Sequence, residues 1–272
     1  MNRWLLVAAG LLYVGSLYAE NSRPGDALLP TGFSRIEMKV EDVDREALIY
    51  APESAHSTDT PVVFVFHGHG GGARQVARSI TISRDWPEAI SVYMQGLNTP
   101  GKLTDPEGKK AGWQSGAGVL NDRDLKFFDA MLEKVKHDYK VDPKRIYATG
   151  HSNGGGFTYL LWEKRPDVFA AFAPSSALTR NAASLKPKPV LHIAGEKDPL
   201  VKFEWQKMCI EAVKKVNGCE GDGKSWGTNC TIYPSKSGTP LITLIHSGGH
   251  EFVAAAPAMI VKFFKEYAMM EK

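Results

Sequence analysis

Short apolar runs alternate with amphipathic stretches along most of this chain. Residues 62–66, Val-Val-Phe-Val-Phe, form a continuous β-branched and aromatic run, which is typical of a strand buried on both faces. Comparable runs predict further strands over residues 90–95, 145–149, 169–173, 190–194 and 241–246. Between them, residues 122–139 carry apolar side chains at helical spacing. Similar patterns predict helices over residues 73–84, 155–164, 203–217 and 254–267.

The order of these predicted elements favours one fold class. Strands that alternate with helices predict an α/β fold with a doubly wound, mostly parallel sheet. Ahead of it, residues 33–40 and 45–50 alternate between apolar and polar positions and predict an antiparallel hairpin. The chain has 272 residues, of which 43% are hydrophobic, and it shows no internal repeat or linker. We therefore expect a single domain over residues 20–272.

The first residues have the pattern of a secretory leader. Arg3 provides a positive charge, residues 4–17 are apolar, and Ala19 ends a plausible cleavage site. The apolar stretch is short for a membrane span, although an uncleaved anchor is the alternative. We expect residues 1–19 to be a signal peptide and the protein to be secreted or periplasmic, with no membrane association after cleavage.

The overall charge argues against one class of partner. The chain has 33 Lys and Arg against 30 Asp and Glu, a net charge of +3. Because neither sign dominates, the sequence gives no electrostatic support for binding nucleic acid.

One motif points to chemistry. Gly150-His-Ser-Asn-Gly154 follows the strand predicted over residues 145–149 and precedes a predicted helix. A G-x-S-x-G sequence between a strand and a helix places its serine on a sharp turn, where the glycines relieve crowding. Ser152 is therefore the candidate nucleophile of a serine hydrolase.

A serine nucleophile needs a histidine base and a carboxylate that fixes the histidine's tautomer. Asp198 and His250 each follow a predicted strand, and the order Ser, Asp, His is that of α/β-hydrolases. The carboxyl ends of parallel strands lie at one edge of a sheet, so we expect these side chains to meet there. Asp198 is favoured over Glu196 because it precedes the point where the loop turns toward the next helix.

The negative charge of an acyl-transfer intermediate requires two N–H donors, an oxyanion hole. Asn153, the residue after the candidate nucleophile, is expected to provide one. The Gly-rich loop over residues 67–72 is expected to provide the other, where we favour His69, with Gly70 as the near alternative. We interpret His67 as a residue that braces this loop.

The same loop has two rival interpretations. Gly68-x-Gly70-x-x-Ala73 fits a dinucleotide-binding fingerprint, but the pattern is weak and an exported protein meets little free dinucleotide. His67 and His69 lack a third ligand at useful spacing, so we expect no metal site.

The three cysteines lie in the last quarter of the chain. Cys209 falls within a predicted helix, about 15 Å from Cys219 along the axis, which is too far for a disulfide. Cys219 and Cys230 flank a Gly- and Asp-rich loop that can fold back on itself. We therefore expect a Cys219–Cys230 disulfide, with Cys209 as a buried free thiol.

Together these motifs resemble a known family. The segments are His67-Gly-His-Gly-Gly71, Tyr147-Ala-Thr-Gly-His-Ser-Asn-Gly-Gly155, Gly195-Glu-Lys-Asp198 and Gly248-Gly-His250. They are similar to secreted α/β-hydrolase esterases that include polyhydroxybutyrate depolymerases, feruloyl esterases and acetyl xylan esterase-like members of carbohydrate esterase family 1. The resemblance extends over residues 33–266 and implies a Ser152, Asp198, His250 esterase without a metal or organic cofactor. The family's cysteine pair agrees with the expected disulfide, whereas Glu251-Phe252 departs from the aromatic residue and proline that often follow the histidine.

The substrate site is expected to be open. Only residues 174–189 separate the two strands between which related enzymes insert a lid, so the site suits bulky or polymeric esters. Trp113 is the candidate substrate-binding residue, stacking on a sugar or an aromatic acyl group; the other interpretation is a core tryptophan that anchors its loop. Trp205, at helical spacing from Met208 and Cys209, is expected to lie in the core.

We therefore expect a secreted serine esterase that cleaves feruloyl or acetyl esters of plant polysaccharide. A polyhydroxyalkanoate depolymerase is the alternative within this class. Two alternatives belong to other classes. One is a serine peptidase of the prolyl oligopeptidase type, for which the chain lacks a propeller-sized N-terminal region. The other is a non-catalytic carbohydrate-binding protein, which would not need Ser152, Asp198 and His250.

Overall fold

The computed structural model describes residues 29–101 and 103–269. The predicted signal peptide, residues 1–19, lies outside these ranges. Within them, no helix combines the length and the apolar character needed to cross a membrane.

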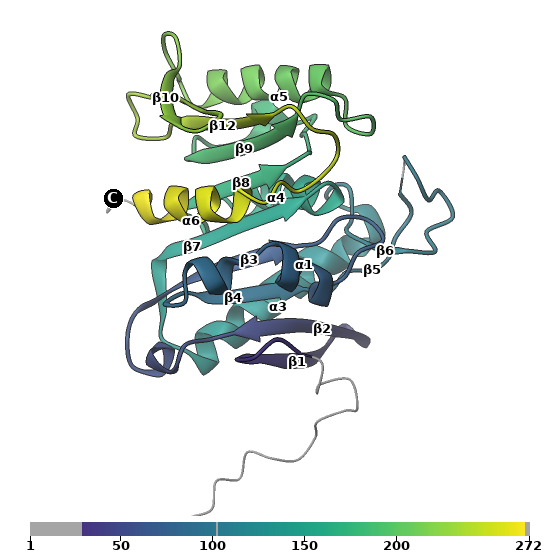
Figure 1. Ribbon diagram of the computed structural model, residues 1–272. Coiled ribbons are helices and arrows are strands. Elements are labelled where there is room, and N and C mark those ends of the chain that lie inside the picture. The colour runs from purple at the N-terminus through teal and green to yellow at the C-terminus, as the bar shows by residue number, and fades with distance from the viewer. Residues whose placement is uncertain (1–28, 102, 270–272) are drawn as a thin grey trace, which may run out of the picture.

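A large sheet forms the centre of the molecule (Figure 1). Over the described residues it has ten strands in the order β1-β2-β4-β3-β7-β8-β9-β12-β11-β10. The strands from β4 to β12 in this order pair in parallel, and antiparallel hairpins lie at both margins. The strands are β1 (Phe33–Val40), β2 (Val43–Tyr50), β3 (Thr60–Phe66), β4 (Ile90–Met94), β7 (Val141–His151), β8 (Ala171–Ser175), β9 (Val190–Gly195), β10 (Lys224–Gly227), β11 (Cys230–Tyr233) and β12 (Leu241–His246).

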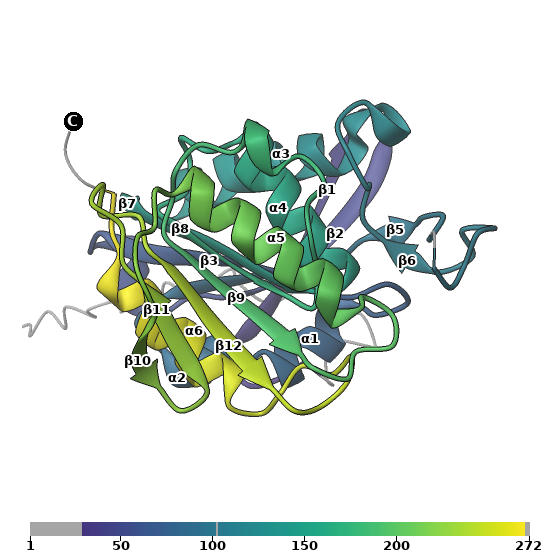
Figure 2. The same ribbon diagram turned by 90° about the horizontal axis from the view of Figure 1, so that it is seen from above.

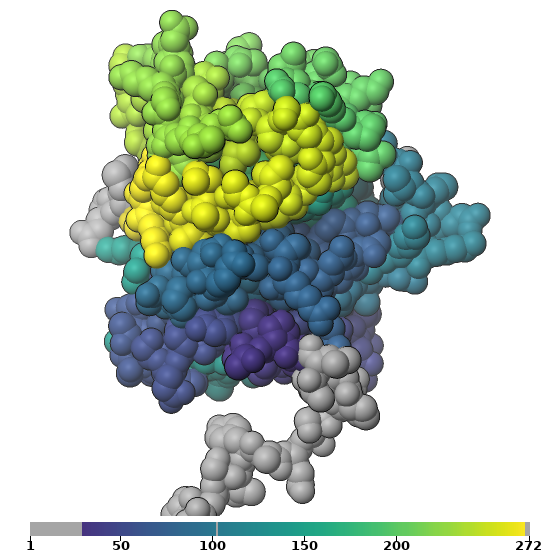
Figure 3. All heavy atoms as spheres, in the orientation of Figure 1, coloured from purple at the N-terminus to yellow at the C-terminus, as the bar shows by residue number. Residues whose placement is uncertain are grey.

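Helices cover both faces of this sheet (Figure 2). One face carries α3 (Arg123–Asp138), α4 (Asn153–Lys164) and α5 (Phe203–Val216). The other carries α1 (Ala73–Ser79), α2 (Ile82–Asp85) and α6 (Ala256–Glu266). On that face α6 packs beside α2, and its atoms lie against those of the α1–α2 region (Figure 3). The predicted α/β fold with a doubly wound, mostly parallel sheet is confirmed.

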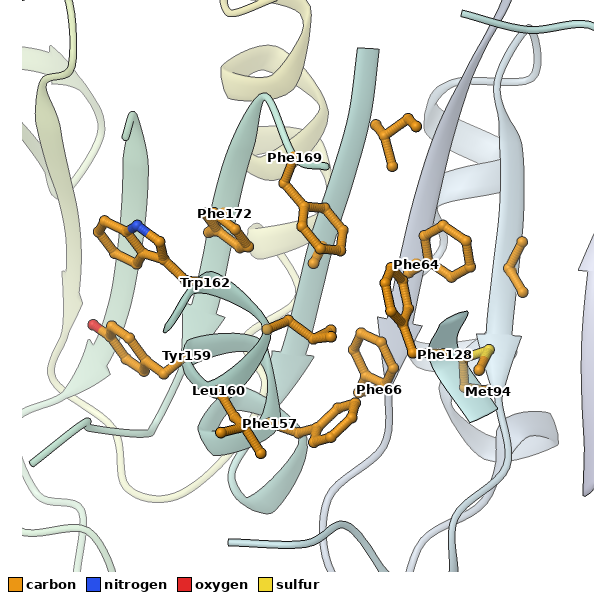
Figure 4. Close-up of a cluster of buried hydrophobic side chains, with 14 of the residues drawn as sticks. Phe64, Phe66, Met94, Phe128, Phe157, Tyr159, Leu160, Trp162, Phe169 and Phe172 are labelled. Atoms are coloured by element: carbon orange, nitrogen blue, oxygen red, sulfur yellow. The ribbon is translucent and has the colours of Figure 1, made fainter. Parts of the chain in front are cut away.

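Aromatic side chains fill the space between the sheet and the α3–α4 layer (Figure 4). Phe64 of β3 packs edge-on against Phe128 of α3, with ring centroids 5.0 Å apart. Phe66, near the end of β3, packs in the same way against Phe157 of α4, also at 5.0 Å. Each fully buried phenylalanine stabilises the fold by roughly 2 to 3 kcal/mol. This packing fixes the end of β3 against α4, and the candidate site is built at this end of the sheet.

Two short hairpins differ from the predicted elements. β5 (Leu97–Asn98) and β6 (Ala111–Gly112) pair within the long polar loop and carry it away from the body (Figures 1 and 2). β10 and β11 form one margin of the sheet. Both hairpins are short, so neither gives a hydrophobic run in the sequence. The helix predicted over residues 73–84 is two helices, α1 and α2.

Candidate active site

Ser152 lies on a tight turn between β7 and α4. Its backbone has φ 57° and ψ −119°, a conformation that a non-glycine residue keeps only when its surroundings hold it. The Ser152 N–H donates to the Ser175 carbonyl at 2.9 Å. Two glycines allow the turn because a side chain would not fit at either position. A Cβ added to Gly150 would lie 2.5 Å from the carbonyl oxygen of Gly154, and a Cβ added to Gly154 would lie 2.3 Å from the carbonyl oxygen of Phe66. The hydroxyl therefore sits at the carboxyl end of the sheet.

Ser152, His250 and Asp198 form a hydrogen-bonded chain. The Ser152 Oγ is 2.7 Å from His250 Nε2, and His250 Nδ1 is 2.8 Å from Asp198 Oδ2. An ionised carboxylate only accepts, so Nδ1 carries the proton and Nε2 accepts from the serine hydroxyl. The Asp198 side chain is fully buried, whereas that of His250 is 16% exposed. The structure thus brings together the three side chains that the sequence singled out.

The Asp198 carboxylate is fixed by further donors. Its Oδ1 accepts the backbone N–H groups of Leu200 and Val201, each at 2.9 Å. Its Oδ2 accepts from Gln206 Nε2 at 3.3 Å, and the same amide donates to the Val201 carbonyl at 2.7 Å. Gln206 is fully buried at the start of α5. Gln206 was not predictable from the sequence, because one polar residue in an amphipathic helix carries no distinguishing signal.

The Gly-rich loop after β3 approaches Ser152. A Cβ added to Gly68 would lie 3.5 Å from the Ser152 Cβ. The Gly70 N–H already donates to the Ala111 carbonyl at 2.7 Å. In the described part of the chain, no acceptor pairs with the N–H of His69 or of Asn153. This pattern favours His69 over Gly70 as the second oxyanion donor.

The side chains of these two residues hold the β5–β6 segment. His69 Nε2 is 3.0 Å from Asp105 Oδ2. Asn153 accepts the Trp113 N–H at 2.6 Å and donates to the Trp113 carbonyl at 3.1 Å. Burial alone would raise the pKa of Asp105, but hydrogen bonds, first from His69 and then from the Lys110 N–H, lower it. Asp105 therefore ties a projecting loop to the proposed oxyanion donor.

Two more histidines shape the site. His67 is fully buried; its Nδ1–H donates to the Gly68 carbonyl at 2.8 Å, and its Nε2 accepts the Gly96 N–H at 2.9 Å, which fits the predicted bracing role. His151 donates from Nε2 to the His250 carbonyl at 3.2 Å. Burial first, and then the nearby His250, lower the pKa of His151 to about 4, so its ring is neutral at pH 7.

A cleft of about 1020 Å³ contains Ser152 and His250. One wall comprises α1 and residues of the β5–β6 segment, including Leu103. A second wall comprises residues 177–181 together with the start of α5. The hydroxyl and the imidazole thus lie in a cleft that has room for a ligand larger than the ester group itself.

Comparisons with known proteins identify relatives of this chain. The sequence profile of the prolyl oligopeptidase family matches residues 108–186, which include Ser152. The "Probable feruloyl esterase C" of Aspergillus oryzae is 27% identical over 223 residues, covering 79% of this chain and 78% of that protein. The protein of the same name from Aspergillus niger is 33% identical over 206 residues, covering 70% of each. The chain belongs to the feruloyl esterase family. The solved acetyl xylan esterase of Aspergillus awamori shares its α/β-hydrolase fold, with TM-score 0.64 at 14% identity over 85% of this chain and 99% of that one.

In this esterase, the prediction that Trp113 binds substrate is wrong. Trp113 borders the cleft, but its side chain is only 1% exposed. Its indole N–H donates to the His67 carbonyl at 2.9 Å, and its ring stacks on Phe157 at 5.2 Å. It is the core residue that anchors the loop. Trp205, expected in the core, instead lines the cleft and is 45% exposed.

The predicted Cys219–Cys230 disulfide of this esterase is wrong as well. All three cysteines are free thiols, and Cys209 is buried, as expected. Cys219 packs toward the apolar cluster on the α5 face of the sheet, whereas Cys230 belongs to the cluster on the α6 face. Within the β10–β11 hairpin region, Cys219 lies opposite Ser235 whereas Cys230 lies opposite Gly227, so the two cysteines are not opposite each other.

Proposed function

We propose that this member of the feruloyl esterase family hydrolyses feruloyl or acetyl esters of plant polysaccharide through Ser152, His250 and Asp198. The observation that carries the proposal is the hydrogen-bonded chain of 2.7 Å and 2.8 Å from the Ser152 hydroxyl to the buried Asp198. The substrate class is supported by the names of the two Aspergillus relatives and, for acetyl esters, by the motif resemblance to acetyl xylan esterase-like proteins.

The proposed acylation uses His250 first as a base and then as an acid. Its Nε2 takes the Ser152 proton while Oγ attacks the ester carbonyl carbon. The N–H groups of Asn153 and His69 stabilise the negative charge on the carbonyl oxygen. The ester C–O bond then breaks, His250 gives its proton to the departing alcohol oxygen, and the acyl group remains on Ser152.

The proposed deacylation repeats these steps with water. His250 takes a proton from the water as its oxygen attacks the acyl carbon. Collapse of this second intermediate breaks the bond to Ser152 Oγ, which recovers its proton from His250. Asp198 stays ionised throughout and stabilises the imidazolium that forms at each stage.

The proposal includes export from the cytoplasm. The positive Arg3, the apolar residues 4–17 and Ala19 support a leader that is removed before Glu20. N-terminal sequencing of the protein recovered outside the producing cells should begin near Glu20. Recovery of the full-length chain from the cytoplasm alone would contradict this part of the proposal.

The test is turnover of a small ester panel by the purified protein. The panel is p-nitrophenyl acetate, methyl ferulate, a hydroxybutyrate oligomer and a peptide p-nitroanilide, the last because the matched family profile is that of a peptidase. We expect the first two esters to be hydrolysed and Ser152→Ala to lose roughly 10³-fold or more in kcat. Preferred cleavage of the oligomer would assign a polyester depolymerase, and preferred cleavage of the anilide a peptidase. Activity of Ser152→Ala at the wild-type level would overturn the mechanism.

A further inference from the structure

An exposed aromatic side chain stands in the cleft that contains Ser152. Trp205, in the first turn of α5, is 45% exposed and lines the second wall of the cleft. Leu200, which is 37% exposed, lines the same wall. Exposed apolar side chains that gather in a concave site mark a place where a ligand binds, so Trp205 and Leu200 point to a ligand contact.

The position of Trp205 is fixed by the candidate catalytic acid. Its chain neighbour Gln206 is fully buried and donates to Asp198 Oδ2 at 3.3 Å. Asp198 in turn accepts the Leu200 N–H and holds His250 Nδ1. The wall that carries Trp205 is therefore connected to His250 through Gln206, Leu200 and Asp198.

The chemistry of ester cleavage decides which part of the substrate lies on this wall. In the proposed cycle, the His250 Nε2 donates its proton to the oxygen of the departing alcohol. The alcohol must therefore lie beside His250 Nε2 when the ester bond breaks. Trp205 and Leu200 line the cleft next to the loop that positions His250.

We propose that Trp205 is the platform for the sugar ring that carries the ester, on the alcohol side of the bond. This inference rests on the proposed function, and it adds the location of the sugar subsite. The flat indole face matches the row of C–H groups on one face of a pyranose or furanose ring, while the sugar hydroxyls stay in water or meet polar groups. Arg180, exposed on the same wall, supplies charged donors for such hydroxyls. An open wall of this kind accepts a sugar that continues into a polysaccharide chain.

The experiment compares two esters of the same acyl group, one with methanol and one with a xylan-type oligosaccharide. For Trp205→Ala, we expect the ratio of kcat/KM for the oligosaccharide ester to that for the methyl ester to fall about fivefold or more, through a higher KM. Trp205→Phe should recover most of this ratio because it keeps an aromatic face. Met208→Ala is the matched control, since Met208 is a 71% exposed apolar residue of α5 that does not line the cleft, and it should keep the wild-type ratio.

Binding without turnover separates this inference from the proposed function. Calorimetric titration of Ser152→Ala with the unesterified oligosaccharide should give a measurable affinity, and Trp205→Ala in that background should weaken it severalfold. An unchanged ratio and an unchanged affinity in Trp205→Ala would overturn the sugar subsite even if the wild-type protein is an active esterase. Failure of the wild-type protein on every ester, with oligosaccharide binding intact, would instead overturn the proposed function alone.

Discussion

At the scale of single residues, the tautomer of the candidate base His250 depends on the Asp198 carboxylate. Asp198 accepts from His250 Nδ1, so Asp198→Asn would present an amide N–H to that nitrogen and favour the wrong tautomer. We expect kcat on an activated ester to fall by about 10³ to 10⁴, with an unchanged circular dichroism spectrum. Glu196→Gln, a nearby carboxylate that was the weaker candidate in the sequence, serves as the control and should stay near wild-type. Comparable losses in both variants would contradict the assignment of Asp198.

Two buried histidines make stability depend on pH. Burial lowers the pKa of His151 and of His192 to about 4, against an ordinary value of 6.5. The unfolded chain therefore binds more protons than the folded chain between about pH 4 and 6.5, and the free energy of unfolding falls as the pH falls through this window. Each histidine contributes a slope on the order of 1 kcal/mol per pH unit.

Urea unfolding at pH 7 and at pH 4.5 measures this effect. We expect His151→Gln and His192→Gln each to lose less stability than the wild-type protein between these conditions, because glutamine does not titrate. His137→Gln is the control, since the His137 side chain is 87% exposed. A wild-type pH response in both buried-site variants would show that these histidines do not titrate as inferred.

Some residues of the candidate site could be predicted from the sequence and others could not. Ser152, Asp198 and His250 were predictable because each follows an apolar strand, so chain order and sheet geometry bring them to one edge. The roles of Trp113 and Trp205 were not predictable from local pattern. Their exposure depends on how a long loop folds over Phe157 and on how the start of α5 is anchored, and both are tertiary effects.

At the scale of elements, the β5–β6 segment positions the proposed oxyanion donors. The Asp105 carboxylate holds the His69 ring, so Asp105→Asn should loosen the loop that carries the His69 N–H. Removal of a whole oxyanion donor costs about 10² to 10³ in kcat, so loosening one should cost roughly tenfold while KM changes little. Affinity for a boronic acid that forms a tetrahedral adduct with Ser152 should fall in parallel.

Asp138→Asn is the matched control for this experiment. Asp138 also lies beside a histidine, with its Oδ1 2.9 Å from His137 Nδ1, but it is on the outer surface of α3. Its replacement should leave kcat and the boronic acid affinity at wild-type values. If Asp105→Asn raised KM and left kcat unchanged, the loop would contribute to substrate binding instead of oxyanion stabilisation.

Elements were predictable in proportion to their burial. The parallel strands gave long apolar runs, and β12 matches its predicted range of residues 241–246. The β10–β11 hairpin was not predicted, because its strands have four residues each and are largely exposed or half-buried at the sheet margin. Such strands are specified by pairing with a neighbour, here β12, which no local pattern reports.

At the scale of the whole molecule, the parallel order of the sheet collects all proposed catalytic groups at one edge. Ser152 follows β7, Asp198 follows β9, His250 follows β12, and His69 follows β3. Because these strands are parallel neighbours or near neighbours, the loops that follow them meet although they lie far apart in sequence. The meeting of these side chains is therefore a consequence of the sheet topology.

The same sheet keeps the cysteines apart. Cys219 pairs with Ser235, so the two residues are neighbours across the hairpin. The chain from Cys230 to Ser235 spans roughly 16 Å at 3.3 Å per residue. Cys230 therefore lies farther from Cys219 than the Cα separation of about 7 Å that a disulfide tolerates. We expect alkylation of the denatured protein without prior reduction to label Cys209, Cys219 and Cys230. We also expect the same Tm with and without reductant. Because a native disulfide contributes about 2 to 4 kcal/mol, a bridge would instead reveal itself by a Tm several degrees lower on reduction and by a single labelled thiol. That outcome would require the β10–β11 margin to fold differently, with both sulfur atoms on one face of the sheet.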